Sequence, residues 1–268
     1  MNFTRLYAVA LRQFYLMRGS LSRVLPLFAW VTVDMALWGF LTRYLNTVAA
    51  AGFSFVATIL GAVLLWDFFM RVMQGVTMAF FEDVWARNFL NFFASPLTLW
   101  EYLGGLVVSS VATSALGLAA MLLLACFGFG LSFAAYGALM APYLAVLFIF
   151  GIALGIMASA LVLRLGPASE WLVWPIPALI APFAGVFYPV STLPPWMRLV
   201  SRLLPPAYVF ESMRAIAAGL RPSSSSPVLT AGLLALAYLA AACRIFELTY
   251  RHATRTGLIA RYSAESVG

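Results

Sequence analysis

Three ionisable side chains inside otherwise apolar stretches are the first sign of chemistry in this sequence. Asp34 stands in one apolar run, and Asp67 and Arg71 stand four residues apart in the next. Side chains four apart meet on one helix face, so Asp67 and Arg71 can form an ion pair. Charges inside apolar helices are costly and face protein or water. We favour a structural cluster that joins two helices, and the alternative is a proton or substrate site.

A second group of chemically suggestive residues follows at residues 80–96, where an acidic pair precedes a run of aromatic side chains. The spacing predicts a helix that Ser95-Pro96 terminates, because proline disfavours helix in the residue before it. Such an amphipathic helix suits docking to a partner protein, and it suits lying on a membrane surface equally well. Its candidate contact residues are Glu82, Asp83, Trp85, Arg87, Phe89, Leu90, Phe92 and Phe93.

Several kinds of site are excluded by residue usage. The chain has no lysine, and a Walker A phosphate loop requires one, so if ATP drives this protein, another subunit must bind the ATP and its Mg²⁺. Two cysteines and one histidine, distant in sequence, give no zinc-binding pattern. We also find no catalytic cluster. The net charge of +7 is consistent with arginines beside membrane spans, so no nucleic-acid partner is expected.

The elements that must position these groups are membrane helices. Hydrophobic residues make up 64% of the chain and charged residues 9%, against about 25% charged in soluble domains. We therefore predict an all-α polytopic membrane protein with six transmembrane helices in a single domain, residues 1–268. The predicted spans are residues 24–45, 53–75, 103–127, 136–163, a proline-rich segment that starts at 171, and 228–248.

The N-terminal segment, residues 1–20, predicts an amphipathic interface helix. Phe3, Tyr7 and Phe14 recur at helical spacing, while Arg5 and Arg12 share a different face. Six spans place both termini on one side of the membrane. Most arginines fall on the side of the termini, which predicts cytoplasmic termini by the positive-inside rule.

The stretch from Trp171 to Arg221 is apolar but rich in proline, so it cannot form one straight helix. We expect it to enter the membrane, break, and fold back as an external re-entrant hairpin over residues 192–219. Pro194-Pro195 and Pro205-Pro206 suit the first turns of two short helices. The residues expected to shape this hairpin are Pro189, Pro194, Trp196, Pro205, Tyr208, Glu211 and Arg214.

Two sets of motifs resemble a known family. One is Asn91-Phe92-Phe93-Ala94-Ser95-Pro96-Leu97. The other comprises Phe187-Tyr188-Pro189, Leu193-Pro194, Leu204-Pro205-Pro206-Ala207-Tyr208 and Glu211-Ser212-Met213-Arg214. With the order of elements, these resemble the permease subunits of ABC-2 type transporters, of the group that exports drugs, lipo-oligosaccharides and polysaccharides. Tyr188 and Pro206-Ala207 depart from the family pattern.

The resemblance implies a permease of the bacterial cytoplasmic membrane that forms a dimer, with itself or a related permease, and binds a separate ABC ATPase subunit. It implies that residues 80–96 are the coupling helix, that the N-terminal helix helps to hold the ATPase, and that the hairpin caps the exit path. The expected cargo is amphipathic, lipid-like or a glycolipid or polysaccharide, or else a hydrophobic drug, in contact with membrane lipid.

Two other classes of protein remain as alternatives. A proton- or ion-coupled secondary transporter would use Asp34 and Asp67, and such proteins often show two similar halves. A membrane enzyme acting on lipid-linked substrates would need a polar catalytic cluster at one interface. We find neither internal repeats nor such a cluster in the sequence.

Overall fold

The computed structural model describes residues 2–48, 56–86, 95–131, 140–219 and 226–257, and their regular structure is helical. Within these described ranges, five helices are long and apolar enough to cross a membrane, which confirms the all-α polytopic fold class. The α-helices are α1 (Phe3–Arg18), α2 (Leu21–Val48), α3 (Gly61–Trp85), α5 (Leu99–Leu123), α6 (Met140–Leu165), α7 (Pro175–Ala184), α8 (Pro195–Ser201), α9 (Pro205–Ala217) and α10 (Ser226–Arg255). Short π-helical turns, η1 (Val56–Leu60) and η2 (Leu124–Gly128), and short 3-10 turns, η4 (Pro167–Leu172) and η5 (Val190–Thr192), adjoin them.

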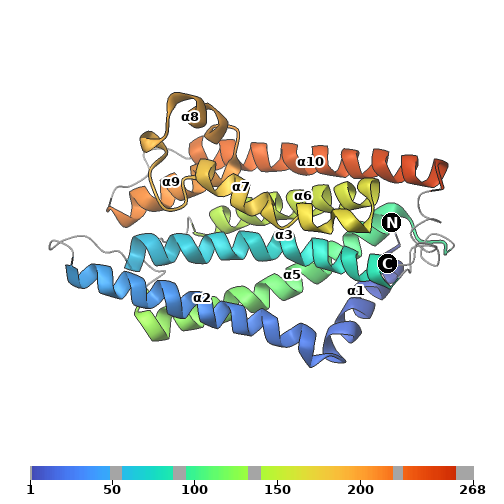
Figure 1. Cartoon of the computed structure of the whole chain (residues 1–268), viewed down its shortest axis with the longest axis horizontal. Helices are drawn as coiled ribbons and strands as arrows, with labels where there is room; N and C mark the ends of the chain where they lie inside the picture. Colours follow the sequence, from blue (N-terminus) through green and yellow to red (C-terminus); the bar gives the residue numbers. More distant parts are fainter. Residues whose placement is uncertain (1, 49–55, 87–94, 132–139, 220–225, 258–268) are drawn as a thin grey trace.

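The centre of the molecule is the pair α3 and α6, with α10 on the far side of α6 and α5 beside α3 (Figure 1). Small residues allow this close packing. A Cβ added to Gly155 of α6 would lie 2.8 Å from the carbonyl oxygen of Met73 in α3, so only glycine fits there. Phe69 stacks on Phe150 between the same helices. Glycine in α6 therefore lets the backbones of α3 and α6 approach closely.

Two ends of the bundle are distinguished by their contacts. At one end, which we call the α1 end, the indole N–H of Trp85 donates to Glu170 at 3.0 Å. At the other, the α9 end, the ring of Trp66 packs against that of Phe210, with the two ring centroids 6.2 Å apart. Trp66 and Trp85 both belong to α3, so the two ends lie about 28 Å apart along its axis.

The proline-rich fifth segment is broken, as the sequence predicts, and it does not form one long helix. Between α6 and α8 the chain forms η4 and then α7, which has only 10 residues. Pro175 and Pro177 stand in its first turns, Pro182 removes a hydrogen bond inside it, and Gly185 ends it at φ +63°. The broken path still leads from Glu170 at the α1 end toward the α9 end, where Arg214 donates to the carbonyl of Gly185 at 2.6 Å.

The second predicted span differs from expectation, because it is longer at its C-terminal end. The sequence predicts an end at residue 75 and a separate helix over residues 80–96, whereas α3 continues to Trp85. No proline interrupts this region, and Gly75 is a packing residue: a Cβ there would meet the Ser110 hydroxyl at 2.7 Å. Similarly, α10 continues to Arg255, where a polar tail was expected after residue 248.

Candidate functional site: the α1 end, a cavity and a hairpin

A buried carboxylate joins three helices at the α1 end. Asp83, fully buried near the end of α3, accepts a hydrogen bond from Arg12 of α1 at 2.5 Å and another from the hydroxyl of Tyr102 of α5 at 2.8 Å. Tyr102 is also fully buried. A charge-assisted bond in such a site is strong because no water competes for it. We call this arrangement the Asp83 clamp.

The start of α5 adds a second connection to α1. Glu101 forms a capping box with Thr98, and its carboxylate also accepts the backbone N–H of Asn2 at 2.5 Å. Arg5 lies 3.6 Å from the same carboxylate and donates to the carbonyl of Pro96. The N-terminus of α1 is therefore held by the first turn of α5.

The two helices can approach closely because α5 carries glycine where α1 crosses it. A Cβ on Gly105 would lie 2.4 Å from the side chain of Val9, and one on Gly104 would lie 2.9 Å from Leu6. Val9 is buried in this contact. These close contacts pack α1 against α5, in addition to the polar contacts that Glu101 makes with Asn2 and Arg5.

The arginine face of α1 contacts the protein, and its aromatic face points away. Phe3 is 80% exposed, and Tyr7 and Phe14 are more than half exposed. The sequence predicts that Arg5 and Arg12 share one helix face, but it does not predict their contacts with the cluster of Asp83, Glu101 and Tyr102. Two features of the sequence could have indicated these contacts. One is the pair of arginines seven residues apart on the N-terminal helix, and the other is the presence of acidic residues at the start or end of later apolar runs.

The predicted ATPase-coupling residues fall into two sets. Glu82, Asp83 and Trp85 belong to the last turns of α3, where Glu82 lies 3.4 Å from Arg23 of α2 and Trp85 bonds Glu170. The others lie outside the described residues: Arg87, Phe89, Leu90, Phe92 and Phe93.

The membrane-embedded charges lie on two helices. Asp34 is on α2, while Asp67 and Arg71 are on α3, and the three are close enough to interact electrostatically. Arg71 passes over Gly117 of α5, where a Cβ would lie 3.2 Å from its Cδ. The structure thus brings together the three charges that the sequence singled out. Whether they serve structure or proton transfer stays a prediction.

A cavity of about 350 Å³ opens beside this cluster, between α1, α2, α3 and α5. We call it the α3–α5 cavity. Its lining mixes charged, amide, hydroxyl and aromatic side chains, including Arg23, Trp30, Arg71, Gln74, Glu82 and Ser114.

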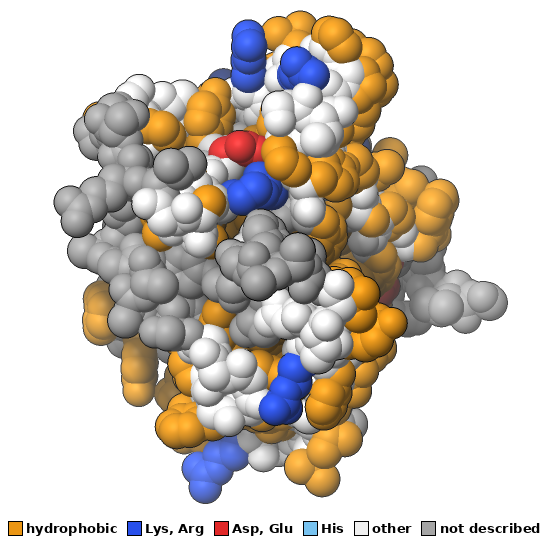
Figure 2. Space-filling view, turned by 90° about the vertical axis from the view of Figure 1, so that its left-hand side faces the viewer, with side chains coloured by type: hydrophobic (Ala, Val, Ile, Leu, Met, Phe, Trp, Pro, Cys, Tyr) orange, Lys and Arg blue, Asp and Glu red, His pale blue; other side chains and the backbone are white. Residues whose placement is uncertain are grey.

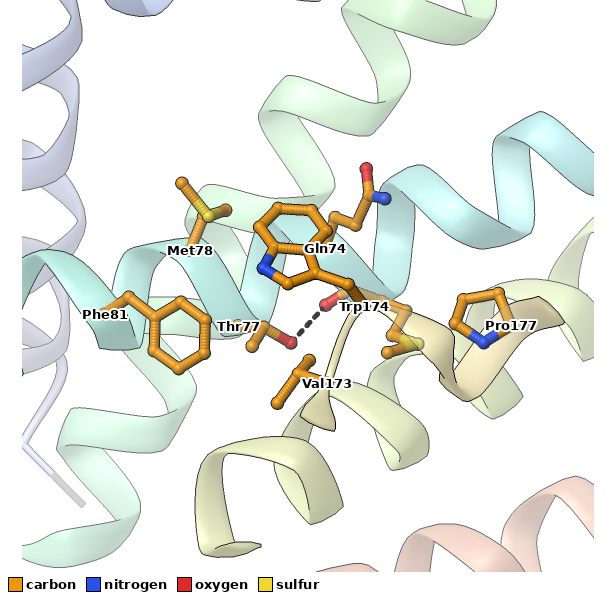
Figure 3. A pocket seen from close by; sticks show the side chains of 8 residues that line it. Gln74, Thr77, Met78, Phe81, Val173, Trp174 and Pro177 are labelled. Atoms are coloured by element: carbon orange, nitrogen blue, oxygen red, sulfur yellow. Dashed lines mark hydrogen bonds between the residues drawn. The ribbon is translucent and has the colours of Figure 1, made fainter. Parts of the chain in front are cut away.

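A much smaller pocket lies on the other side of α3, against η4 and α7. Figure 3 shows Val173, Trp174 and Pro177 beside α3, where the hydroxyl of Thr77 donates to the carbonyl of Met73 at 2.8 Å. Gln74 and Met78 line both this pocket and the α3–α5 cavity. The pocket and the cavity on either side of α3 therefore share Gln74 and Met78 in their linings.

At the α9 end, the segment predicted as a hairpin contains the two short helices α8 and α9, each with proline in its first turn. Pro194 is the N-cap of α8, and Pro205 opens α9. Seen from this end, arginine side chains stand over α8, with acidic and basic side chains side by side below (Figure 2). Gly219, at φ +76°, follows Ala218, the C-cap of α9.

Polar contacts hold this segment in shape. The carboxylate of Glu211 accepts a hydrogen bond from the side chain of Arg214 at 2.8 Å and another from the backbone N–H of Val190 at 2.6 Å. These bonds connect η5 to α9. Pro189 is the N-cap of η5, and the hydroxyl of Tyr208 donates to the carbonyl of Arg202 at 2.8 Å. The ring of Trp196 contacts Phe183 of α7 at 6.1 Å. All seven residues predicted to shape the hairpin belong to this part of the structure.

Comparison with known proteins agrees with this architecture. The family model described as ABC-2 type transporter matches residues 5–217, from the first turn of α1 to the end of α9. A search of curated proteins finds no match. Because the family model matches most of the chain, the chain belongs to the ABC-2 type transporter family.

Proposed function

We propose that this chain is the permease of an ATP-driven exporter, and that it forms the substrate path as a dimer in the bacterial cytoplasmic membrane. Family membership implies a membrane location and association with an ABC ATPase subunit. In this proposal the chain binds no nucleotide and the ATPase subunit supplies hydrolysis. Both termini, and hence the α1 end, face the cytoplasm, and the α8–α9 hairpin caps the exit on the external side.

The Asp83 clamp is the observation that carries the coupling part of the proposal. It connects α1 and α5 to the last turns of α3, at the start of residues 80–96, the segment proposed to couple to the ATPase. A displacement of that segment would move α3, because a helix transmits force along its axis and the clamp prevents α3 from moving alone. The core helix α3 also borders both cavities, so such a movement would reshape the space around it.

Copurification tests the partner, and substitution tests the coupling. A tagged chain should copurify with an ABC ATPase, and the mass of the complex should equal two permeases and two ATPases. Replacing Phe89 and Phe92 with glutamate should abolish ATPase binding while the permease remains folded. A complex that forms normally with both substitutions would contradict a docking role for residues 80–96.

A further inference from the structure

The α3–α5 cavity is elongated, and its lining sets polar and charged side chains among apolar ones. Arg71, Gln74, Met78, Glu82 and Trp85 recur every three or four residues and place one face of α3 along it. That face is about 21 Å long, so the cavity runs from the α1 end to the middle of α3. Its volume of about 350 Å³ falls within the range of about 300–1,000 Å³ found for ligand pockets.

Two oxygen atoms in the lining have no hydrogen-bond partner among the residues that the structure describes. They are Oγ of Ser114, whose residue is 1% exposed, and Oε2 of Glu82. Ser114 lies on α5 toward the deep end, and Glu82 lies at the α1 end. Buried polar atoms usually have partners, and leaving them unpaired is costly. A ligand that donates hydrogen bonds at both ends of the cavity would remove this cost.

The charges of the lining restrict the class of ligand. A hydrocarbon chain would leave Ser114 and Glu82 unpaired. A cationic ligand would face Arg23 and Arg71, and an anionic one would face Glu82 without donating to it. A neutral polyhydroxylated ligand avoids all three problems, since each hydroxyl donates to carboxylate or serine and also accepts from arginine or glutamine.

The rim of the cavity indicates how such a ligand would arrive. Trp30 of α2 lines the cavity and is 66% exposed, and it lies within a helix able to cross a membrane. Its exposed ring would face lipid tails at that depth, whereas Arg23 and Glu82 lie near the helix ends. A ligand with an apolar tail could therefore keep the tail in the bilayer and place its head group in the cavity.

We propose that the α3–α5 cavity binds the neutral sugar head group of an amphiphile. As a cargo class this rests on the export function proposed above, but as a binding site within one chain it does not. The cavity lies between helices of a single protomer, and binding there requires neither ATP nor the partner subunit.

Soluble probes of matched length test the chemistry directly. The full chain in nanodiscs is titrated with maltose, with triethylene glycol dimethyl ether, which only accepts hydrogen bonds, and with spermidine, which is cationic. Tryptophan fluorescence gives the dissociation constants, since Trp30 and Trp85 line the cavity. Maltose should bind at least tenfold more tightly than either other probe. Equal or tighter binding of the ether or of spermidine would overturn the proposal.

Decyl maltoside tests the amphiphile part, and it should bind more than tenfold more tightly than maltose because its tail leaves water. No gain over maltose would refute an amphiphile.

Substitutions locate the site. Ser114→Leu fills the deep end, and Glu82→Gln removes the charged acceptor at the other, so each should weaken maltose binding about tenfold. Ala112→Leu, on the exposed face of the same helix, should leave it within twofold of the wild type. If Ser114→Leu binds maltose as well as Ala112→Leu does, the sugar binds elsewhere and the assignment is wrong. These titrations contain no ATPase, so their failure is separable from failure of the proposed export function.

Discussion

Replacing Arg12 by methionine removes the cation that faces the buried carboxylate of Asp83 while keeping most of the side-chain volume. Breaking a buried ion pair by removing one partner costs about 3–5 kcal/mol, because the remaining charge stays buried. Asp83 is fully buried, whereas the Arg12 side chain is 28% exposed, and the Tyr102 bond remains. We therefore expect the lower end of the range, about 3 kcal/mol.

The cost should appear locally, as release of α1, because Arg12 contributes to holding that helix and the core pair α3 and α6 does not depend on it. A loss of about 3 kcal/mol raises the population of the open state by on the order of a hundredfold. Hydrogen exchange of amides in Phe3–Arg18 should accelerate by a similar factor, while exchange in α6 stays unchanged.

Arg18→Met is the matched control, since Arg18 is an exposed arginine on the same helix. It should leave the exchange of α1 amides within about twofold of the wild type, as exposed charges contribute little. The reasoning is refuted if Arg12→Met and Arg18→Met give the same exchange rates in α1.

Three further substitutions test other contacts. Gly105→Leu should displace α1 and lower the free energy of unfolding by about 1–3 kcal/mol. Adding Val9→Ala to this variant should partly restore its thermal stability in detergent. A Gly105→Leu variant as stable as the wild type would contradict the close approach of the two helices. Gly117→Leu should push Arg71 out of position and lower the unfolding temperature, and an unchanged temperature would mean that the arginine has room to move. Arg214→Met should lower the free energy of unfolding by about 1–2 kcal/mol, since the Arg214–Glu211 pair is partly exposed, and it should speed proteolysis near the hairpin. Equal cleavage rates in this variant and the wild type would show that the contact of Arg214 with Gly185 is dispensable.

The helical fold could be predicted from sequence because its signal is local. Long apolar runs identify membrane helices, and the paired prolines place the starts of α8 and α9. The ends of the helices were harder to predict from the sequence. The second predicted span ended at residue 75, whereas α3 continues to Trp85 and Gly75 packs against Ser110, a contact that a single sequence does not reveal.

The candidate site was only partly predictable for a different reason. Asp34, Asp67 and Arg71 stood out because charge is rare in apolar segments. The Asp83 clamp joins residues 12, 83 and 102, and such pairing depends on how helices pack rather than on any local pattern. The α3–α5 cavity depends on four helices together, so its existence required the structure.

The most direct test of coupling to an ATPase is hydrolysis by the purified complex in proteoliposomes, measured for the wild type, Arg12→Met and Arg18→Met. We predict that the wild type and Arg18→Met give substrate-stimulated ATP hydrolysis, and that Arg12→Met retains basal hydrolysis but loses the stimulation. Equal stimulation in all three proteins, or no hydrolysis in a complex purified with the wild-type chain, would contradict the proposal that this permease is driven through the Asp83 clamp.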